Sequence, residues 1–408
     1  MNNLKSSIFN INLDVDEQHY IYNTSSNTLI QVDKDLLDFM DNDEIAFLKS
    51  NKFLVEKHDD EILLLNKEVD DNINALKDRL DLTIILTETC NFQCVYCYQS
   101  KISRIFTKKD ANNLLKKIEE LYKNGLRTMQ IHYFGGEPLL NFDILEYIDS
   151  KIKELSSVYN VKYIKHITTN GSLLTKEILD KINFDLIQLT FDGNENWHQK
   201  LKISNSFSYR QLLDLAKLIM SDSQSNLSIR FNICKENKDS FLETLETLLS
   251  YPSFDSKRVR FAFNPMRNFT NSKHFTELTP EEFSQIDWTL RKFLQKHGIK
   301  LFLPAAIKQP CKFISGNAIC VGHELKTYFC TSCFNNGISS FPTDHVPLST
   351  NYHYNFKEKC KKCSVLPLCL NACAMLDPNK NACISEKYIL KDILTDFIKN
   401  PSNWKTHA

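Results

Sequence analysis

The segment Leu82-Thr-Ile-Ile-Leu-Thr-Glu-Thr-Cys90-Asn-Phe-Gln-Cys94-Val-Tyr-Cys97 joins an apolar, strand-like run to three cysteines within eight residues. Three thiolates on one loop can hold a single metal cluster. A four-iron cluster takes four ligands, so three nearby cysteines leave one iron open to a substrate or cofactor. The alternative is a zinc site, with His132 or His166 as the fourth ligand after folding. The loop therefore indicates a metal site.

Composition narrows the class of protein. With 408 residues, of which 42% are apolar, the chain suits two or three domains. Lys+Arg and Asp+Glu both number 50, which argues against nucleic acid or a membrane surface as a partner. The start lacks the apolar region of a secretory signal and no stretch is long enough to span a membrane, so we expect a cytoplasmic protein. In that compartment the 13 cysteines indicate metal binding or catalysis rather than disulfides.

From residue 82 onward, strand and helix patterns alternate in six units. Strands are predicted at residues 82–87, 128–134, 161–168, 186–191, 227–233 and 259–263. Helices are predicted at residues 108–123, 142–155, 175–182, 209–220, 240–249 and 280–297. Such a succession favours parallel strands with right-handed crossovers. It predicts an α/β fold and fits an open sheet or a barrel equally well.

Two further regions flank this repeat. Residues 1–80 predict a small α+β unit with β-rich stretches at 8–15 and 19–32, strand-like patterns at 53–56 and 62–65, and a linking helix from 66 to 80. Nine of the cysteines fall between residues 311 and 383, where helical periodicity fades. That region cannot bury much apolar surface by itself, so inorganic cross-links are expected to stabilise it. The predicted domains are therefore 1–80, 81–302 and 303–408.

The cysteine loop resembles that of the radical S-adenosylmethionine (SAM) superfamily, because CX3CX2C with an aromatic Tyr96 before the last cysteine follows a first strand. The resemblance implies a partial six-unit TIM-like barrel. It implies that Cys90, Cys94 and Cys97 hold a 4Fe–4S cluster whose open iron binds SAM. It also implies reductive cleavage of SAM to a 5′-deoxyadenosyl radical that abstracts hydrogen from the substrate.

The same resemblance extends to the loops that follow the later strands. Gly135-Gly136-Glu137-Pro138 matches the family segment that holds the amino group of SAM, and two glycines allow close approach of the backbone to a ligand. Residues that match the ribose and methionine pocket lie at the next strand ends, as barrel enzymes arrange their sites. They are Asn170, Thr190, Asp192, Lys202 and Arg230. Thr190 replaces a more usual Ser, and Lys202 replaces an Arg without its bidentate geometry.

The C-terminal cysteines resemble the SPASM extension, which carries two auxiliary 4Fe–4S clusters in relatives. The spacing CX2CX5CX3C with a later cysteine implies a distal cluster on Cys360, Cys363, Cys369 and Cys383. The nearer cluster would be held by Cys311, Cys330 and Cys373, with Cys320 as fourth ligand and Cys333 as its alternative. A zinc ribbon is the competing interpretation. The expected cofactors are therefore three 4Fe–4S clusters and SAM.

Enzymes with such extensions mostly modify peptides or proteins. The resemblance favours a maturase of a ribosomally made precursor peptide, with residues 1–80 gripping the leader by adding a strand to a sheet edge, or simply capping the barrel. The alternative is a formylglycine-forming, sulfatase-maturase-like enzyme, but Thr331 stands where those enzymes carry an Asp. A zinc-stabilised binding protein is a third alternative. The expected partners are a precursor peptide and a flavodoxin- or ferredoxin-type electron donor, and no catalytic base is assigned.

Overall fold

The structure is a computed structural model. The structure describes residues 3–32, 41–99, 102–269, 271–313, 315–328, 330–332, 356–371 and 383–405. The chain divides into two compact units. Unit 1 contains residues 1–75, 279–315 and 351–408, and unit 2 contains residues 76–278 and 316–350.

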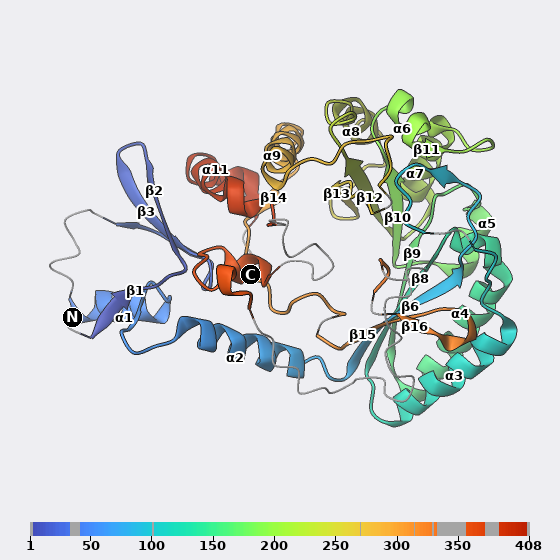
Figure 1. Ribbon diagram of the computed structural model, residues 1–408, viewed down its shortest axis with the longest axis horizontal. Coiled ribbons are helices and arrows are strands. Elements are labelled where there is room, and N and C mark those ends of the chain that lie inside the picture. Colours follow the sequence, from blue (N-terminus) through green and yellow to red (C-terminus); the bar gives the residue numbers. More distant parts are fainter. Residues whose placement is uncertain are drawn as a thin grey trace. The chain divides into compact units, whose positions relative to one another are not determined.

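Unit 2 is built on an eight-stranded sheet in which six consecutive strands, counted from one edge, are parallel (Figure 1). In sheet order these strands are β13 (Val259–Pro265), β12 (Asn226–Ile233), β10 (Leu186–Phe191), β9 (Lys162–Thr168), β8 (Thr128–Gly135) and β6 (Arg79–Thr87). Each of the six strands predicted between residues 82 and 263 overlaps one of them. The α/β class with a partial six-unit barrel is therefore confirmed.

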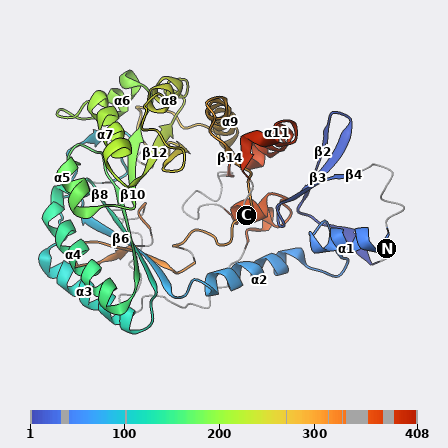
Figure 2. The ribbon, with the colours of Figure 1, turned by 180° about the vertical axis from the view of Figure 1, so that it is seen from behind.

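Helices alternate with these strands along one face of the sheet, and Figure 2 shows the arrangement from behind. They are α3 (Lys108–Lys123), α4 (Phe142–Tyr159), α5 (Lys176–Ile182), α7 (Tyr209–Asp222) and α8 (Phe241–Leu249). Periodicity placed them because each buries an apolar stripe, as α3 does with Leu114, Leu115 and Ile118. The start of α3 is fixed by a capping box between Thr107 and Asp110. The short helix α6 (Glu195–Leu201) and the 3₁₀ turns η2 (Pro138–Asn141) and η3 (His323–Leu325) were not predicted.

A late segment of the chain completes this sheet. β15 (Ala318–Val321) runs parallel to β6, with Cys320 opposite Thr83, and β16 (Thr327–Tyr328) pairs antiparallel to β15. Both strands come from the predicted cysteine-rich region, so part of that region covers the first edge of the barrel sheet. The predicted three-part division into domains stays a prediction.

Unit 1 combines both ends of the chain. Its strands are β1 (Leu4–Ser6), β2 (Asn10–Val15), β3 (Gln18–Asn23), β4 (Thr28–Val32), β5 (Leu54–Glu56), β14 (Leu301–Phe302) and β17 (Trp404–Lys405). Its helices are α1 (Asn42–Ser50), α2 (Glu61–Asn74), α9 (Pro280–Lys296), α10 (Leu366–Cys369) and α11 (Glu386–Lys399), with 3₁₀ turns η4 (Glu358–Cys360) and η5 (Pro401–Asn403). The predicted strand at 62–65 is wrong, because these residues form the first turns of α2 behind an Asp60 cap.

One hydrophobic cluster joins the two ends of the chain within unit 1. Ile11 and Leu13 of β2 are buried with Ile389 and Ile393 of α11, and Trp404 packs beside them. The region after 303 does not form this core by itself, because the apolar side chains of α11 pack against β2 from the other end of the chain. Among the described residues, no helix is both long and apolar enough to cross a membrane.

Candidate functional site

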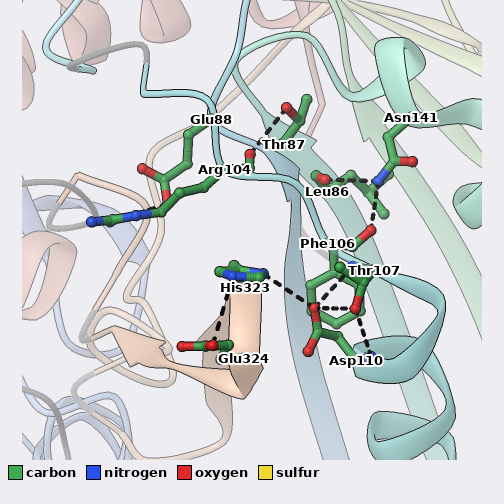
Figure 3. Close-up of polar contacts among 10 residues, drawn as sticks. All are labelled: Leu86, Thr87, Glu88, Arg104, Phe106, Thr107, Asp110, Asn141, His323 and Glu324. Atoms are coloured by element: carbon green, nitrogen blue, oxygen red, sulfur yellow. Dashed lines mark hydrogen bonds and ion pairs between the residues drawn. The ribbon is translucent and has the colours of Figure 1, made fainter.

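The three-cysteine loop leaves the end of β6 and is closed at its base by hydrogen bonds (Figure 3). The backbone N–H of Phe106 donates to the carbonyl of Leu86 at 2.8 Å, and the hydroxyl of Thr87 donates to the carbonyl of Arg104. The side-chain amide of Asn141 donates to the carbonyls of both Leu86 and Phe106, each at 2.9 Å. The returning chain is therefore held beside β6, and the cysteines lie on a tethered loop.

Two charged contacts lie beside the base of the cysteine loop. The buried Glu88 carboxylate pairs with the Arg104 guanidinium at 3.7 Å. The His323 imidazole lies 3.3 Å from a carboxylate oxygen of Asp110, which also caps α3 (Figure 3). The turn after β15 is thereby attached to the helix that follows the cysteine loop.

The cysteine loop also forms a small sheet of its own. β7 (Gln93–Cys94) pairs antiparallel with β11 (Lys202–Ile203), with Cys94 opposite Lys202. Burial raises the pKa of the Cys94 thiol to about 12, against the lowering effect of the Lys202 ammonium, and the Cys97 and Cys90 thiols raise it further. The loop therefore brings the three thiols into electrostatic range of one another.

The Gly135–Gly136 backbone lies directly against this loop. Gly135 has φ +148°, and a Cβ there would lie 2.3 Å from the carbonyl oxygen of Thr87. A Cβ on Gly136 would lie 2.1 Å from the Thr89 carbonyl oxygen and 3.0 Å from the backbone nitrogen of Cys90. Only glycine permits such an approach, so this backbone fixes the position at which Cys90 leaves the strand.

Glu137 is fully buried and joins two strand ends. Its carboxylate accepts from the Thr169 hydroxyl and from the backbone N–H of Asn170, both at 2.7 Å, and from the N–H of Leu139 at 3.2 Å. Burial raises the pKa of Glu137, and these donors counteract the rise. In this structure the carboxylate holds the third strand-end loop, whereas its predicted contact with SAM stays a prediction.

Asn170 contacts the cysteine loop. Its side-chain amide donates to the Asn91 side chain at 2.8 Å and lies 3.8 Å from the Cys90 sulfur. Its amide oxygen accepts from the backbone N–H and the hydroxyl of Ser172 at 2.9 and 2.7 Å. The third strand end is thus joined to the first.

Asp192, at the end of β10, is the centre of a buried polar network. Its carboxylate accepts from the Tyr96 hydroxyl at 2.6 Å and from the Asn232 side chain at 3.1 Å. Arg230 in turn donates to Asn232 at 2.8 Å, and the Asn237 amide donates to the main-chain carbonyl of Asp192. Burial raises the pKa of Asp192, and Lys202 and the Tyr96 hydrogen bond oppose this rise. The network ties the cysteine loop to β10 and β12.

Lys202 lies buried beside the same strand end. Its ammonium donates to the main-chain carbonyl of Thr190 at 3.0 Å and lies over the Phe92 ring. His198 is also buried, and its Nδ1 accepts from the backbone N–H of Asp192 at 3.3 Å. Lys202 is therefore a cation held among Thr190, Asp192 and Cys94.

Two of the cysteines predicted for the nearer auxiliary cluster lie in unit 2, close to the loop. The Tyr98 hydroxyl donates to the carbonyl of Thr331, the residue after Cys330, at 3.0 Å. Burial raises the pKa of the Tyr98 phenol, and the Cys97, Cys320 and Cys330 thiols raise it further. Tyr98 thus lies within electrostatic range of Cys97, Cys320 and Cys330.

The other cysteines predicted for that cluster are placed differently. Cys311 is exposed and belongs to unit 1, whereas Cys320 and Cys330 belong to unit 2. Cys373 and Cys333 lie outside the described residues. The ligand set of the nearer cluster stays a prediction.

The four cysteines predicted for the distal cluster gather in unit 1. Cys360, Cys363 and Cys369 pack against one hydrophobic cluster with Leu366. The N–H of Cys363 donates to the carbonyl of Cys360 at 2.9 Å in a tight turn, and the Cys383 thiol is close enough to raise the pKa of Cys360. Cys234, in contrast, is buried among apolar side chains, as expected for a structural thiol.

Cysteine thiolates are the ligands that iron–sulfur clusters use, although among the described residues no three Cys, His, Asp or Glu side chains are arranged as ligands of one metal ion. Metal ligation requires the thiolate, and a coordinating thiol loses its proton because the bound cation outweighs the effect of burial. The three grouped thiols of the first loop leave one position of a four-iron cluster open. Cys90, Cys94 and Cys97 would therefore hold a cluster with an open iron, and Lys202 would supply a positive charge beside it.

Sequence reasoning missed the residues that support this site. Tyr96 was identified as an aromatic position, but its bond to Asp192 was not foreseen. The segment Arg230-Phe231-Asn232 is family-like in sequence, but only Arg230 was assigned a role, although Asn232 lies two positions away and shares one face of β12 with it. The hydrogen bond of Asn237 could not be predicted, because an Asn after a strand is a common turn residue.

Comparison with known proteins agrees with this site. A model of the Radical SAM superfamily matches residues 84–248. The chain is 28% identical over 192 residues to the radical SAM cyclopropyl synthase TigE of Paramaledivibacter caminithermalis, covering 43% of this chain and 36% of that protein. It is 28% identical over 284 residues to a GTP 3′,8-cyclase of Campylobacter jejuni subsp. doylei, covering 66% of this chain and 78% of that protein. TigE and the other first curated relatives are covered over less than two thirds of their own length.

Solved structures share the fold over most of the chain. A structure of anSMEcpe with bound AdoMet and Cp18Cys peptide has a TM-score of 0.56 at 16% identity, covering 80% of this chain and 98% of that one. Streptococcus suis SuiB bound to precursor peptide SuiA has a TM-score of 0.53 at 15% identity, covering 91% and 95%. The chain therefore shares the fold of these proteins, and the likeness extends beyond residues 84–248.

Gly136→Ala tests the close approach of the backbone to the cysteine loop. The new methyl group must displace Thr89 or Cys90, so we expect loss of about four irons after anaerobic reconstitution and about a 100-fold fall in SAM cleavage. Gly125→Ala is the control, because that position has a positive φ but no atom within 4 Å of the new Cβ. Equal iron contents in the two variants would contradict the assignment.

The buried His198 predicts a pH dependence of stability. Burial lowers the pKa of this imidazole well below 6.5, with Lys202 acting in the same direction. The unfolded chain therefore binds the extra proton, so this contribution to stability is present above about pH 6.5 and is lost as the pH falls below it. In urea unfolding of His198→Asn, which keeps an acceptor but does not titrate, the midpoint should fall less between about pH 7.5 and about pH 5.5 than in the wild type. An unchanged difference would show that other groups cause the acid sensitivity.

Proposed function

Because this chain carries a radical SAM domain, we propose that it is a peptide maturase acting on a ribosomally made precursor. It would abstract hydrogen from the precursor and install a thioether or carbon–carbon cross-link, or another modification. The observation that carries the proposal is that the fold likeness to SuiB covers 91% of the chain, well beyond residues 84–248. That structure contains a precursor peptide by its description.

The residues at the strand ends support the reaction. When bound, the cluster and SAM supply a 5′-deoxyadenosyl radical for hydrogen abstraction. Cys90, Cys94 and Cys97 would hold the cluster, and the Gly135–Gly136 backbone would approach the amino group of SAM. Polar residues around the other strand ends would orient the rest of SAM; they are Glu137, Asn170, Thr190, Asp192, Lys202 and Arg230. Asp192 and Glu137 are also fully buried and hydrogen-bonded to neighbouring loops, so each would in addition hold those loops in place.

Unit 1 supports a peptide substrate. Within the described residues β4 pairs only with β3, so one edge of the three-stranded sheet remains for an added strand. Extended peptides bind to such edges through main-chain hydrogen bonds. We infer that the N-terminal unit binds the precursor leader there, and that the distal cysteine set of the same unit holds one of two auxiliary clusters. An external electron donor of the flavodoxin or ferredoxin type would reduce the enzyme.

The second candidate is a formylglycine-forming enzyme. Fold likeness does not separate it from the first candidate, since the structure of anSMEcpe, which contains a Cp18Cys peptide by its description, has a TM-score comparable to that of SuiB. Thr331 argues against it, because its side chain offers a hydroxyl where a carboxylate is expected in that group. A zinc-stabilised binding protein is the remaining alternative, and the iron measurement below separates it from both enzymes.

Cys94→Ala tests the assignment of the first cluster. The reconstituted wild type should hold about twelve irons per chain, and the variant about eight, with no 5′-deoxyadenosine formed from SAM under reducing conditions. Cys234→Ala is the matched control, because this thiol is buried among apolar side chains. It should keep both iron and SAM cleavage. SAM cleavage by Cys94→Ala would overturn the site, and a zinc-loaded wild type would overturn the enzyme.

The peptide substrate is tested directly with short precursors encoded beside this reading frame. Anaerobic incubation with SAM and reductant should lower the precursor mass by two hydrogens for each cross-link, measured by mass spectrometry with fragmentation. A sulfatase-derived peptide serves as the competing substrate. Formylglycine in that peptide, with no change in any precursor, would favour the second candidate.

A further inference from the structure

A groove in the N-terminal part of unit 1 lies between β5 and α2, the long blue helix of Figure 1. Its volume is about 450 Å³, within the usual range of ligand sites. The buried side chains of Phe9 and Leu65 line it, together with Leu54 and Val55 of β5, which are partly buried. Leu64 of α2 also lines the groove and is 48% exposed. The groove therefore offers apolar surface to a ligand.

Charged side chains also line this groove, and four of them form two ion pairs. The Lys49 ammonium pairs with the Glu56 carboxylate at 2.6 Å. The Lys52 ammonium pairs with the Glu68 carboxylate and donates to the Ser25 hydroxyl at 3.2 Å. The charges within each pair cancel, so the net charge of the groove is set by the other residues that line it.

The remaining charged residues of the groove are mainly acidic. Three acids, Asp59, Glu61 and Asp71, stand against one lysine, Lys67, so the lining has a net charge of −2. Asp71 is exposed and forms no ion pair among the described residues. Residues 41–74, which form α1, β5 and α2, include ten acidic and four basic residues, whereas the whole chain has 50 of each. A ligand of this groove is therefore expected to be basic as well as apolar.

The charge of the groove argues against a ligand taken from this protein itself. Residues 33–40, which follow β4 in the sequence, contain three aspartates and one lysine, so their charge has the same sign as that of the groove. A second copy that docked through this face would bring residues 41–74, with a net charge of −6, against the same residues. Like charges on facing surfaces disfavour binding. The groove therefore favours a basic segment of a different chain.

The groove adjoins β4, the strand whose open edge would receive the precursor leader. The hydroxyl of Thr28, the first residue of β4, donates to the side-chain oxygen of Asn51 at 3.2 Å. The next residue, Lys52, lines the groove and contacts Ser25 in the turn before β4. A peptide strand along β4 can therefore continue past Thr28 into the groove.

We propose that this groove binds a short segment of the precursor leader in which apolar side chains are flanked by lysine or arginine. An apolar side chain would cover Leu64 and contact Phe9 and Leu65, and a basic side chain would face Asp71. Apolar contacts would supply most of the affinity, and the charge would supply selectivity. The proposal rests on the proposed function and adds the chemistry of the leader that the enzyme would select.

The test is the binding of a short fluorescein-labelled peptide of leucine and lysine to the full chain, measured by fluorescence anisotropy without SAM or reductant. The same peptide with glutamate in place of each lysine should bind at least tenfold more weakly. The variant Leu64→Lys/Asp71→Lys should weaken binding of the lysine peptide at least tenfold. The difference should shrink at about 1 M salt, where the Debye length is about 3 Å.

The matched control is Leu63→Lys/Asp43→Lys, which changes the net charge by the same amount. Leu63 and Asp43 are exposed and do not line the groove. This variant should keep the wild-type dissociation constant within about twofold. An equal loss in both variants, or equal binding of the two peptides, would overturn the groove as the binding site. Should Leu64→Lys/Asp71→Lys unfold at a lower urea concentration than the wild type, Leu64→Gln/Asp71→Asn replaces it, with a loss of about threefold expected.

Two further measurements separate this proposal from the proposed function. A benzoylphenylalanine in place of one leucine of the peptide should cross-link to α2 or β5 under ultraviolet light, and a cross-link confined to unit 2 would overturn the docking proposal. Modification of a precursor by the groove variant with an unchanged KM would also overturn it and leave the maturase intact. Binding of the lysine peptide in the groove, with no precursor modified, would instead overturn the maturase and leave a peptide-binding groove.

Discussion

The closeness of two backbones at the end of β6 is the constraint on which the site depends. Gly136 passes so near Thr89 and Cys90 that no side chain fits between them. This contact sets where the cysteine loop begins, and the hydrogen bonds of Asn141 and Phe106 close the loop at its base. A loop held at both ends can present three thiols to one cluster, whereas a free loop would have to be ordered by the metal itself.

The buried charged side chains around the loop also hold it in position. Asp192 and Glu137 have no exposed surface, and each carboxylate joins two strand ends through hydrogen bonds. Removing a donor from such a group leaves a buried charge short of partners, which costs about 1–3 kcal/mol or more. Lys202 lies in the midst of these acids and of Cys94, so it balances their charge. These contacts hold the loop residues to the ends of the strands.

Local patterns in the sequence predicted the barrel strands and the three-cysteine loop, because both are determined by residues close together in the chain. Contacts between residues far apart in the chain could not be predicted from these local patterns. Tyr96 and Asp192 meet only after the sheet has formed, and Cys320 takes its place opposite Thr83 through a strand that no periodicity marks. The helix α11 was overlooked because it follows a cysteine-rich stretch, and residues 62–65 are an apolar run whose period fits a strand or a helix. In the candidate site, motif residues were predictable, but the side chains that hold them were not.

Unit 1 draws its core from the two ends of the chain, and this has a consequence for biosynthesis. Domains generally fold as they leave the ribosome, the N-terminal part first. Here Ile11 and Leu13 of β2 are buried against Ile389 and Ile393 of α11. The first sheet therefore waits for α11 before its apolar face is covered, while the barrel strands are already complete. The apolar side chains of β2 are thus uncovered during most of translation, when they can aggregate or be bound by chaperones.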